Sequence, residues 1–385
     1  MESVRLDATE LRARQQKVRR LCEELGSSAL VAFGGPFYDR PGPCAYLTNH
    51  FPPFPAVTPY RSYRSFGYAA ALVPTSTKLP VVLFVDGPHR RELLYADEVR
   101  TTQDIGEAVG EAVRALGVEN LAIAGLDILP AAHYERFERA VGNVVLQMAD
   151  EPLWQLRMIK SSAEQCLLRA AALIADAALR AAIAAAEPGV PETHVCAVGT
   201  ATALRAGADY VRYLRVHTGP WSRAGSRWPQ ATDRVIAEGD LVYLDVIGAY
   251  QGYQFDVLRT TVAGEPSGGQ RSLLEAAYEA LVEAIAVARP GRRCAELYEA
   301  IRQVARAHGR EQQLAAFAGH GIGLETVEPP FITADDPTEL KPGMVLCIEP
   351  KLTDPQIGGV SIEYEVIVQD DGPAEVITHL AGKQW

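Results

Sequence analysis

Cysteine is scarce in this sequence, acidic residues outnumber basic ones, and long uncharged hydrophobic runs are missing. The six cysteines form no CxxC pair and have no regular spacing, so we expect reduced thiols in a cytoplasmic protein rather than a disulfide framework. The most alanine-rich stretch, residues 166–187, is interrupted by Arg169, Asp176 and Arg180, which predicts a core helix and no membrane span. The net charge of −11, from 37 basic and 48 acidic residues, disfavours nucleic acid and anionic membranes as partners.

The pattern along the chain predicts an α/β (α+β) protein of two domains, residues 1–150 and 151–385. No GxGxxG motif follows a predicted strand and no P-loop is present, so a nucleotide site has no support. In the first domain we expect strands at 28–33, 68–74, 81–86 and 120–125, and helices at 10–25, 89–97, 105–116 and 131–141.

The second domain is expected to begin with a nearly continuous helix, residues 151–186. Hairpin signals such as Gln251-Gly252 favour antiparallel pairing among its strands. We expect strands at 211–216, 241–250, 253–264, 344–350 and 360–369, with two long helices at 270–288 and 294–308.

A proline- and aromatic-rich segment, residues 51–68, lies between the first two predicted strands and includes Arg64. It is either a long surface loop or a rim over a substrate site, because long irregular loops in compact domains often carry binding residues.

Several acidic residues lie at the centres of the most strand-like segments. These acids are Asp245, Asp256, Glu349, Glu363 and Glu365. A single acid on a strand usually lies at an edge, in a turn or in an ion pair, but burial of an unpaired carboxylate costs several kcal/mol. Glu363 and Glu365 have the same parity, so they face one side of the strand, where one can be functional and the other a structural partner.

Four such acids, together with His320 between two glycines, favour a metal site. Arg259 is the obvious buried counter-ion, and one guanidinium does not neutralise four carboxylates. Oxygen-rich ligation with one imidazole suits Mn²⁺, Fe²⁺, Co²⁺ or Zn²⁺. Five ligands with carboxylates able to bridge suit two divalent metal ions, which activate water and polarise a carbonyl.

The motifs LVYLDVIGAYQGYQFDVLRT, GHGIGLETVEPP, PGMVLCIEP and GGVSIEYEVIV resemble, in order and spacing, those of the pita-bread metallohydrolases. The helix around 153–178 resembles the linker in the aminopeptidase P, prolidase and creatinase branch. The resemblance implies a creatinase-like α/β N-terminal domain, a catalytic domain with a curved antiparallel sheet flanked by helices, and a homodimer. It also implies a hydrolase in which metal-bound water attacks an amide-like C–N bond of a short peptide or small molecule.

The same resemblance assigns roles to the five ligands. Asp245 would be a terminal ligand of one metal, Asp256 and Glu363 would bridge, and His320 and Glu349 would complete the other metal. Glu349 would also shuttle a proton as a catalytic residue. Arg259 would orient a carboxylate from behind the ligands.

Two positions depart from the family pattern. Val327 stands where family peptidases have a second histidine, and Trp228 stands where they have another histidine before the first metal aspartate. His217 is a candidate catalytic replacement, although a histidine at a strand end is more often hydrogen-bonded or at the surface. Trp221 and Arg223 belong to a segment that is either a basic loop or, with Trp228, Val327 and Arg64, a pocket for a carboxylate or zwitterion.

Three functions therefore stay open at this point. The first is a hydrolase of the Xaa-Pro peptidase, prolidase or creatinase type. The second is a metal-dependent hydrolase or lyase that acts on a small non-peptide metabolite, since Trp228 and Val327 replace the two histidines. The third is a binding module without catalysis, which retention of all five ligands disfavours.

Overall fold

The computed structural model describes residues 6–37, 40–52, 67–224 and 227–385, which form two compact units, Leu6–Arg157 and Met158–Trp385. The division falls inside one helix, seven residues after the boundary that the composition predicts. No helix in the described ranges is both long and apolar enough to cross a bilayer.

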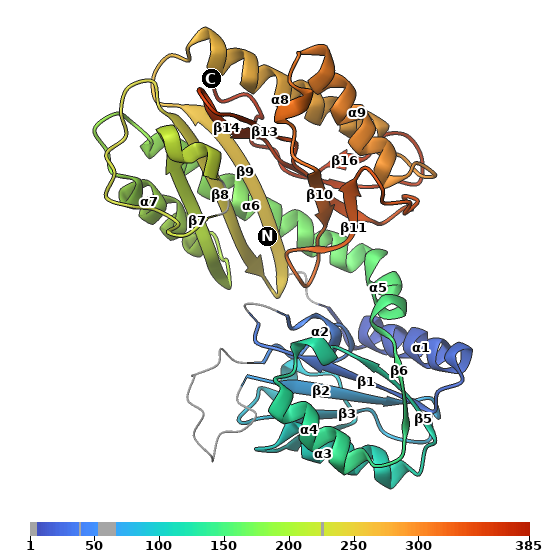
Figure 1. Ribbon diagram of the computed structural model, residues 1–385. Coiled ribbons are helices and arrows are strands. Elements are labelled where there is room, and N and C mark those ends of the chain that lie inside the picture. The colour runs from blue at the N-terminus through green and yellow to red at the C-terminus, as the bar shows by residue number, and fades with distance from the viewer. Residues whose placement is uncertain (1–5, 38–39, 53–66, 225–226) are drawn as a thin grey trace. The chain divides into compact units, whose positions relative to one another are not determined.

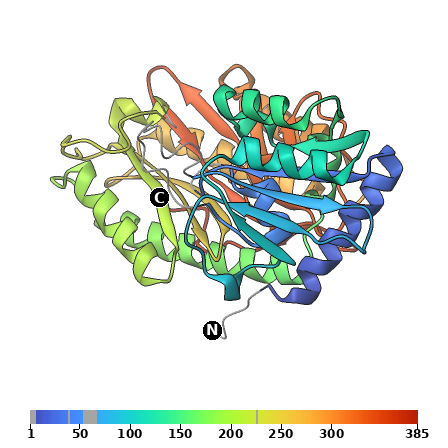
Figure 2. The same ribbon diagram turned by 90° about the horizontal axis from the view of Figure 1, so that it is seen from below.

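A mixed sheet forms the centre of the N-terminal unit. The pairing of β1 with β2 and of β2 with β3 is antiparallel, and the other three pairings are parallel. Helices α3 and α4 cover one face, and α1 and α2 lie on the other (Figures 1 and 2). In spatial order, the described strands are β4 (Glu98–Thr101), β3 (Val82–Val85), β2 (Ala69–Pro74), β1 (Ala29–Gly34), β5 (Asn120–Ala124) and β6 (Val145–Met148). The helices are α1 (Ala8–Leu25), α2 (Gly42–Thr48), α3 (Ile105–Leu116) and α4 (Ala131–Val141), with short 3-10 turns at Arg91–Leu93 and Leu126–Ile128.

The helix expected at 89–97 is wrong. Only the 3-10 turn Arg91–Leu93 forms there, because the Arg91 side chain donates to the carbonyls of Leu94 and Ala96 and so ends the turn. The chain then enters β4, which pairs with β3 at the sheet edge.

The long helix expected over 151–186 is broken into α5 (Asp150–Met158) and α6 (Ser162–Ala185). Ser161 caps α6 through a capping box with Glu164, which satisfies the free amides at the helix start. Helix α7 (Glu192–Arg205), which the sequence pattern did not predict, follows α6.

The C-terminal unit contains antiparallel sheets with helices against both layers (Figure 1). Helices α6 and α7 pack through Leu179 and Val195 against Leu214, Val246 and Val257 of the sheet β7-β8-β9. Helices α8 (Gly268–Val287) and α9 (Cys294–Ala307) pack against the remaining strands. The strands are β7 (Tyr210–Thr218), β8 (Leu241–Tyr250), β9 (Tyr253–Val262), β10 (Phe317–Gly321), β11 (Glu328–Thr333), β12 (Val345–Ile348), β13 (Lys351–Asp354), β14 (Gly358–Ser361), β15 (Tyr364–Ile367) and β16 (Glu375–Val376).

The strand expected over 360–369 is in fact two strands, β14 and β15, in different sheets. Glu363 lies in the break between them, where its amide donates to the carbonyl of Leu258 on β9 at 3.0 Å. The break therefore carries the Glu363 side chain toward the β8–β9 hairpin.

Candidate metal centre

The β8–β9 hairpin places Asp245 and Asp256 on one face. Gln251 and Gly252, both with positive φ, make its tight turn. Asp256 pairs across the strands with Ile247, which lies on the same face of β8 as Asp245. The two carboxylates are therefore diagonal neighbours, within reach of one another's charge.

A second set of strands brings the imidazole and further acids together. His320 on β10 lies opposite Cys347 on β12, and Cys347 lies opposite Glu365 on β15. The glycines beside His320 allow these strands to approach closely. A Cβ on Gly319 would lie 2.2 Å from the Cys347 carbonyl oxygen, and one on Gly321 would lie 2.4 Å from that of Pro329.

The His320 imidazole is oriented as a ligand. Its Nδ1 donates to the Gly321 carbonyl at 3.0 Å, which leaves the Nε2 lone pair directed at the acids. Nε2 lies 3.6 Å from Glu349 Oε1 and 3.7 Å from Asp256 Oδ2. Two donors about 2.1 Å from one tetrahedral ion would lie about 3.4 Å apart, so these separations fit one coordination sphere.

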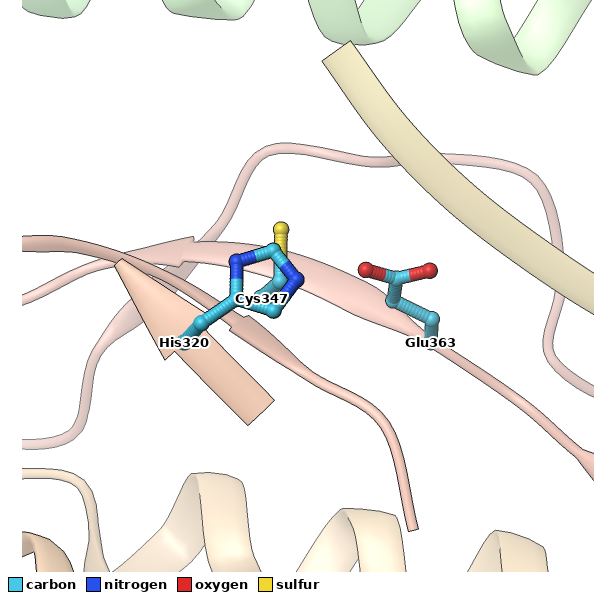
Figure 3. A group of neighbouring side chains, drawn as sticks. All are labelled: His320, Cys347 and Glu363. Carbon is cyan, nitrogen blue, oxygen red and sulfur yellow. The ribbon is translucent and has the colours of Figure 1, made fainter. Parts of the chain in front are cut away.

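Glu363 and Cys347 complete the group around the imidazole. Figure 3 shows the imidazole of His320 and the carboxylate of Glu363 turned toward one another, with the Cys347 thiol beside them. The candidate donor atoms of these three residues all lie within 4.8 Å of one another. The thiol was not predicted as a donor, and only its opposition to His320 in the sheet reveals it.

The electrostatics of the acids favour a bound cation. Burial, followed by repulsion from neighbouring carboxylates, raises the pKa of Asp256 and of Glu363 well above the usual range, and raises the pKa of Glu349 to about 8. Among the described residues, Asp245 Oδ1 and Glu363 Oε1 are buried without a hydrogen-bond partner. Acidic oxygens without donors, grouped around an oriented imidazole, fit a divalent metal ion.

Two cationic side chains lie beside the acids, and the sequence analysis did not predict either of them at the metal centre. Arg215 on β7 lies directly opposite Asp245, and its Nη1 is 2.7 Å from Asp245 Oδ2. Lys351 follows Glu349 by two residues, and its charge opposes the rise in pKa of both Glu349 and Asp245. The signal for Arg215 is the cross-strand register, which local sequence does not contain.

We expected Arg259 to orient a carboxylate, but its contacts are with the main chain. Its guanidinium is fully buried and donates to the main-chain carbonyls of Leu258, Glu363, Leu380 and Ala381. It therefore holds the backbone of Glu363.

Glu365 is buried on β15, two residues after Glu363, and it contacts the main chain of Asp256. Its carboxylate accepts the Asp256 amide at 2.8 Å. It thereby fixes the main chain of a ligand strand, in keeping with a structural partner of the acid cluster.

His217 lies on the same face of β7 as Arg215, two residues further along. Its Nε2 donates to the Pro229 carbonyl at 2.9 Å, and its Nδ1 is buried without a hydrogen-bond partner in the described part of the chain. With Nε2 as the donor, Nδ1 is the ring nitrogen left to accept a hydrogen bond on the face of β7 that carries Arg215.

The expected substrate residues lie at the surface or outside the described ranges. The exposed fractions are 86% for Trp228, 63% for Trp221 and 50% for Val327. Arg223 donates to the Pro355 carbonyl at 3.4 Å and lines a surface pocket with Gly219, which contains none of the five ligands. Arg64 and nearly all of the 51–68 loop lie outside the described residues.

The chain is similar to curated dipeptidases over about two thirds of its length. The Xaa-Pro dipeptidase of Pyrococcus horikoshii is 31% identical over 262 residues, which is 68% of this chain and 72% of that protein. The probable dipeptidase PepE of Mycobacterium tuberculosis is 34% identical over 265 residues, 68% and 69% of the two chains.

Solved structures match over nearly the whole chain. The prolidase from P. horikoshii superposes with a TM-score of 0.82 at 25% identity, over 97% of this chain and 100% of that one. The Xaa-Pro dipeptidase from Bacillus anthracis gives a TM-score of 0.82 at 26% identity, over 97% and 99%. The expected pita-bread architecture is confirmed by these matches.

The sequence profile of metallopeptidase family M24 matches residues 166–370, the range that contains all five expected metal ligands. With these relatives and this architecture, the chain belongs to metallopeptidase family M24 and is a metal-dependent hydrolase.

Proposed function

We propose that this enzyme cleaves the C–N bond of an Xaa-Pro-type short peptide at a centre made by Asp245, Asp256, His320, Glu349 and Glu363. The observation that carries the proposal is the approach of His320 Nε2 to Glu349 and Asp256, at 3.6 and 3.7 Å. The names of the relatives support the choice of substrate.

A divalent ion bound at the centre supplies a Lewis acid that polarises the scissile carbonyl and increases the acidity of water. The ligand chemistry suits Mn²⁺, Fe²⁺, Co²⁺ or Zn²⁺. Among the described residues, Arg215 and Lys351 are the cations beside the four buried acids, so we expect at least one divalent ion to bind there.

Different residues of the chain transfer the proton, bind the water or substrate, and hold the ion. Of the two carboxylates near His320 Nε2, Glu349 is the more exposed, with 22% against 10% for Asp256, so it reaches the substrate side and shuttles the proton. His217 Nδ1 accepts a hydrogen bond from the attacking water or from the substrate amide. Asp256, His320 and Glu363 hold the ion in place.

The test measures metal content and hydrolysis of an Xaa-Pro dipeptide panel before and after chelation. We expect chelation to abolish turnover and one of the four candidate ions to restore it. Asp256→Asn should lose both metal and turnover, whereas Asp335→Asn, an exposed aspartate in a turn, serves as the matched control. A chelated protein that hydrolyses the panel at an unchanged rate would contradict the proposal.

A second candidate is a metal-dependent hydrolase or lyase that acts on a small non-peptide metabolite. It is supported by Trp228 and Val327, which place apolar, largely exposed side chains where family peptidases have histidines. A metal-loaded enzyme that turns over amide or amidine metabolites but leaves every Xaa-Pro peptide intact would favour this candidate.

The proposal also includes a homodimer, which the family resemblance implies, and a cytoplasmic location, which the cysteine usage leads us to expect, with Arg64 contributing to substrate binding. Light scattering after size exclusion tests the dimer. Fractionation of the native host tests the location, and Arg64→Ala tests the loop through KM.

A further inference from the structure

Two phenylalanines, Phe317 on β10 and Phe331 on β11, stay partly exposed beside the metal centre. Their exposed fractions are 39% and 37%. Ala318 and Ile332, the next residue along each strand, are 0% exposed and belong to the hydrophobic core that these strands share with helices α8 and α9. The two phenylalanine rings therefore lie on the face of the sheet that is turned away from this core.

Strand register brings both rings to His320. His320 and Phe331 are direct cross-strand partners, so their side chains share one face of the β10–β11 pair. Phe317 lies three residues before His320, an odd separation that would send its side chain to the opposite face of a regular strand. The register shifts between these two residues, however, and the bulge turns Phe317 toward the imidazole.

The three rings form one continuous aromatic surface. The Phe317 ring stacks on the His320 imidazole, with ring centres 5.9 Å apart and planes inclined by 20°. The Phe331 ring centre lies 6.2 Å from that of Phe317. Strand β11 is the edge strand of its sheet (Figure 1). His320 is only 2% exposed, so the two phenylalanines carry the accessible part of this surface.

The aromatic surface lies within reach of a substrate at the metal centre. A substrate whose scissile carbonyl lies beside His320 presents the neighbouring residue within one Cα–Cα distance, about 3.8 Å. The Phe317 ring centre is 5.9 Å from the centre of the imidazole. A side chain on the residue that adjoins the scissile carbonyl therefore contacts the phenylalanine rings.

The surroundings of the rings favour an uncharged side chain. In the described part of the chain, no arginine or lysine stacks on either ring. The Asp336 carboxylate accepts the Phe331 amide through Oδ2 and the Thr338 amide through Oδ1, each at 2.8 Å, so the main chain already uses both oxygens. Exposed rings gain binding energy by removing apolar ligand surface from water.

We propose that Phe317 and Phe331 are specificity-determining residues, which bind an apolar side chain on the substrate residue that adjoins the scissile carbonyl. The inference rests on the proposed function and adds a substrate class to it. The preferred substrates carry an aliphatic or aromatic residue at this place, rather than glycine or an acidic or basic residue. Neither phenylalanine is among the substrate residues that the sequence predicts.

The experiment measures the dissociation constants of amino acid hydroxamates for the metal-loaded full chain by isothermal titration calorimetry. The hydroxamate group chelates a bound metal ion and presents the amino acid side chain on the carbon next to the chelating carbonyl. Glycine hydroxamate measures the chelating group alone. We expect leucine and phenylalanine hydroxamates to bind about tenfold more tightly than glycine hydroxamate, and aspartate and lysine hydroxamates to gain less than about twofold.

Variants of Phe331 test whether the ring is the source of the preference. Phe331→Ala should reduce the advantage of leucine hydroxamate to about twofold, at unchanged metal content and unchanged affinity for glycine hydroxamate. Phe331→Leu, which keeps an apolar side chain, should retain most of the advantage. Phe331→Gln provides a further variant in case Phe331→Ala does not fold. Val282→Ala, which shortens a side chain that is 46% exposed on α8, is the matched control and should keep the full advantage.

The outcomes separate this inference from the proposed function. Equal affinities for leucine, glycine and aspartate hydroxamates in the unmodified enzyme would overturn the inference. A preference for lysine hydroxamate, which would make the rings a cation-binding surface, or an undiminished leucine advantage in folded Phe331→Ala would also overturn it. A chain that takes up no metal, or a loaded enzyme that binds no hydroxamate, would instead refute the proposed function.

Discussion

Metal-free protein should lose stability as the pH rises from 6.5 to 7.5. Burial, aided by repulsion from Asp245, raises the pKa of Glu349 from 4.5 to about 8. Burial likewise raises the pKa of Glu365 to about 8. Both groups stay protonated in the folded chain at pH values where the unfolded chain has already lost those protons.

The sign and size follow from proton linkage. A folded state that binds more protons than the unfolded state becomes less stable as pH rises, by about 1.4 kcal/mol per proton and pH unit. Glu349 and Glu365 together therefore lower the free energy of unfolding by about 3 kcal/mol between pH 6.5 and 7.5, and Asp256 and Glu363, whose pKa values burial also raises, act in the same direction. For a unit of this size, that lowers the melting temperature by about 6–12 °C.

The window begins at pH 6.5 because histidine acts in the opposite direction below it. Burial lowers the pKa of His320, and that of His50, to about 4. Each buried neutral ring contributes stability that is complete above pH 6.5 and is lost as pH falls toward 4, which offsets the carboxyl groups there.

The assay is urea or thermal denaturation of chelator-treated protein at pH 6.5, 7.0 and 7.5. Glu365→Gln keeps an acceptor for the Asp256 amide but removes one titrating group, so the fall of stability with pH should become less steep. Protein loaded with metal should show a smaller slope, because the ion displaces the protons. A metal-free stability that is flat or rises over this window would refute the linkage argument.

Three further predictions concern single side chains. His217→Gln should lower kcat by about 10²–10³ at unchanged metal content, since a positioned acid–base group contributes about that much, and a loss of metal instead would show a structural role. Val327→His should raise kcat on Xaa-Pro dipeptides by about 10² if peptides are the substrates, and no gain on any peptide would favour the non-peptide candidate. Glu192→Ala should lower the free energy of unfolding by about 3 kcal/mol, measured in urea, because its buried carboxylate accepts bonds from the amides and hydroxyls of Thr218 and Thr232; a loss below about 1 kcal/mol would contradict this.

Much of the fold was predictable because its signals are local. The helices Ile105–Leu116 and Ala131–Val141 end where the sequence places them, at Gly117 and Gly142. The hairpin turn at Gln251-Gly252 lies as expected between two long strands. The helix predicted at 89–97 did not form: the chain there makes a 3-10 turn at Arg91–Leu93 and leads into β4, whose pairing with β3 is a non-local contact.

The acids at strand centres were recognisable as candidate ligands because alternation along a strand leaves no ordinary place for a buried charge. Several short motifs, taken together and in order, also predicted that these acids lie around His320. The cations beside the acids, Arg215 and Lys351, were not recognisable in this way. Arg215 lies in a strand that carries other arginines, and the strand pattern does not indicate which of them faces the acids.

The sequence by itself determined the metal-binding chemistry, because carboxylates and an imidazole on apolar strands require a cation wherever the strands meet. Only the tertiary structure decided that Arg215 faces Asp245 and that Cys347 faces His320. A bulge between Val211 and Tyr213 shifts the register of β7 on β8, and a shift of one residue sends every following side chain to the other face of the sheet. Register is a property of two strands distant in the chain, so no local pattern contains it.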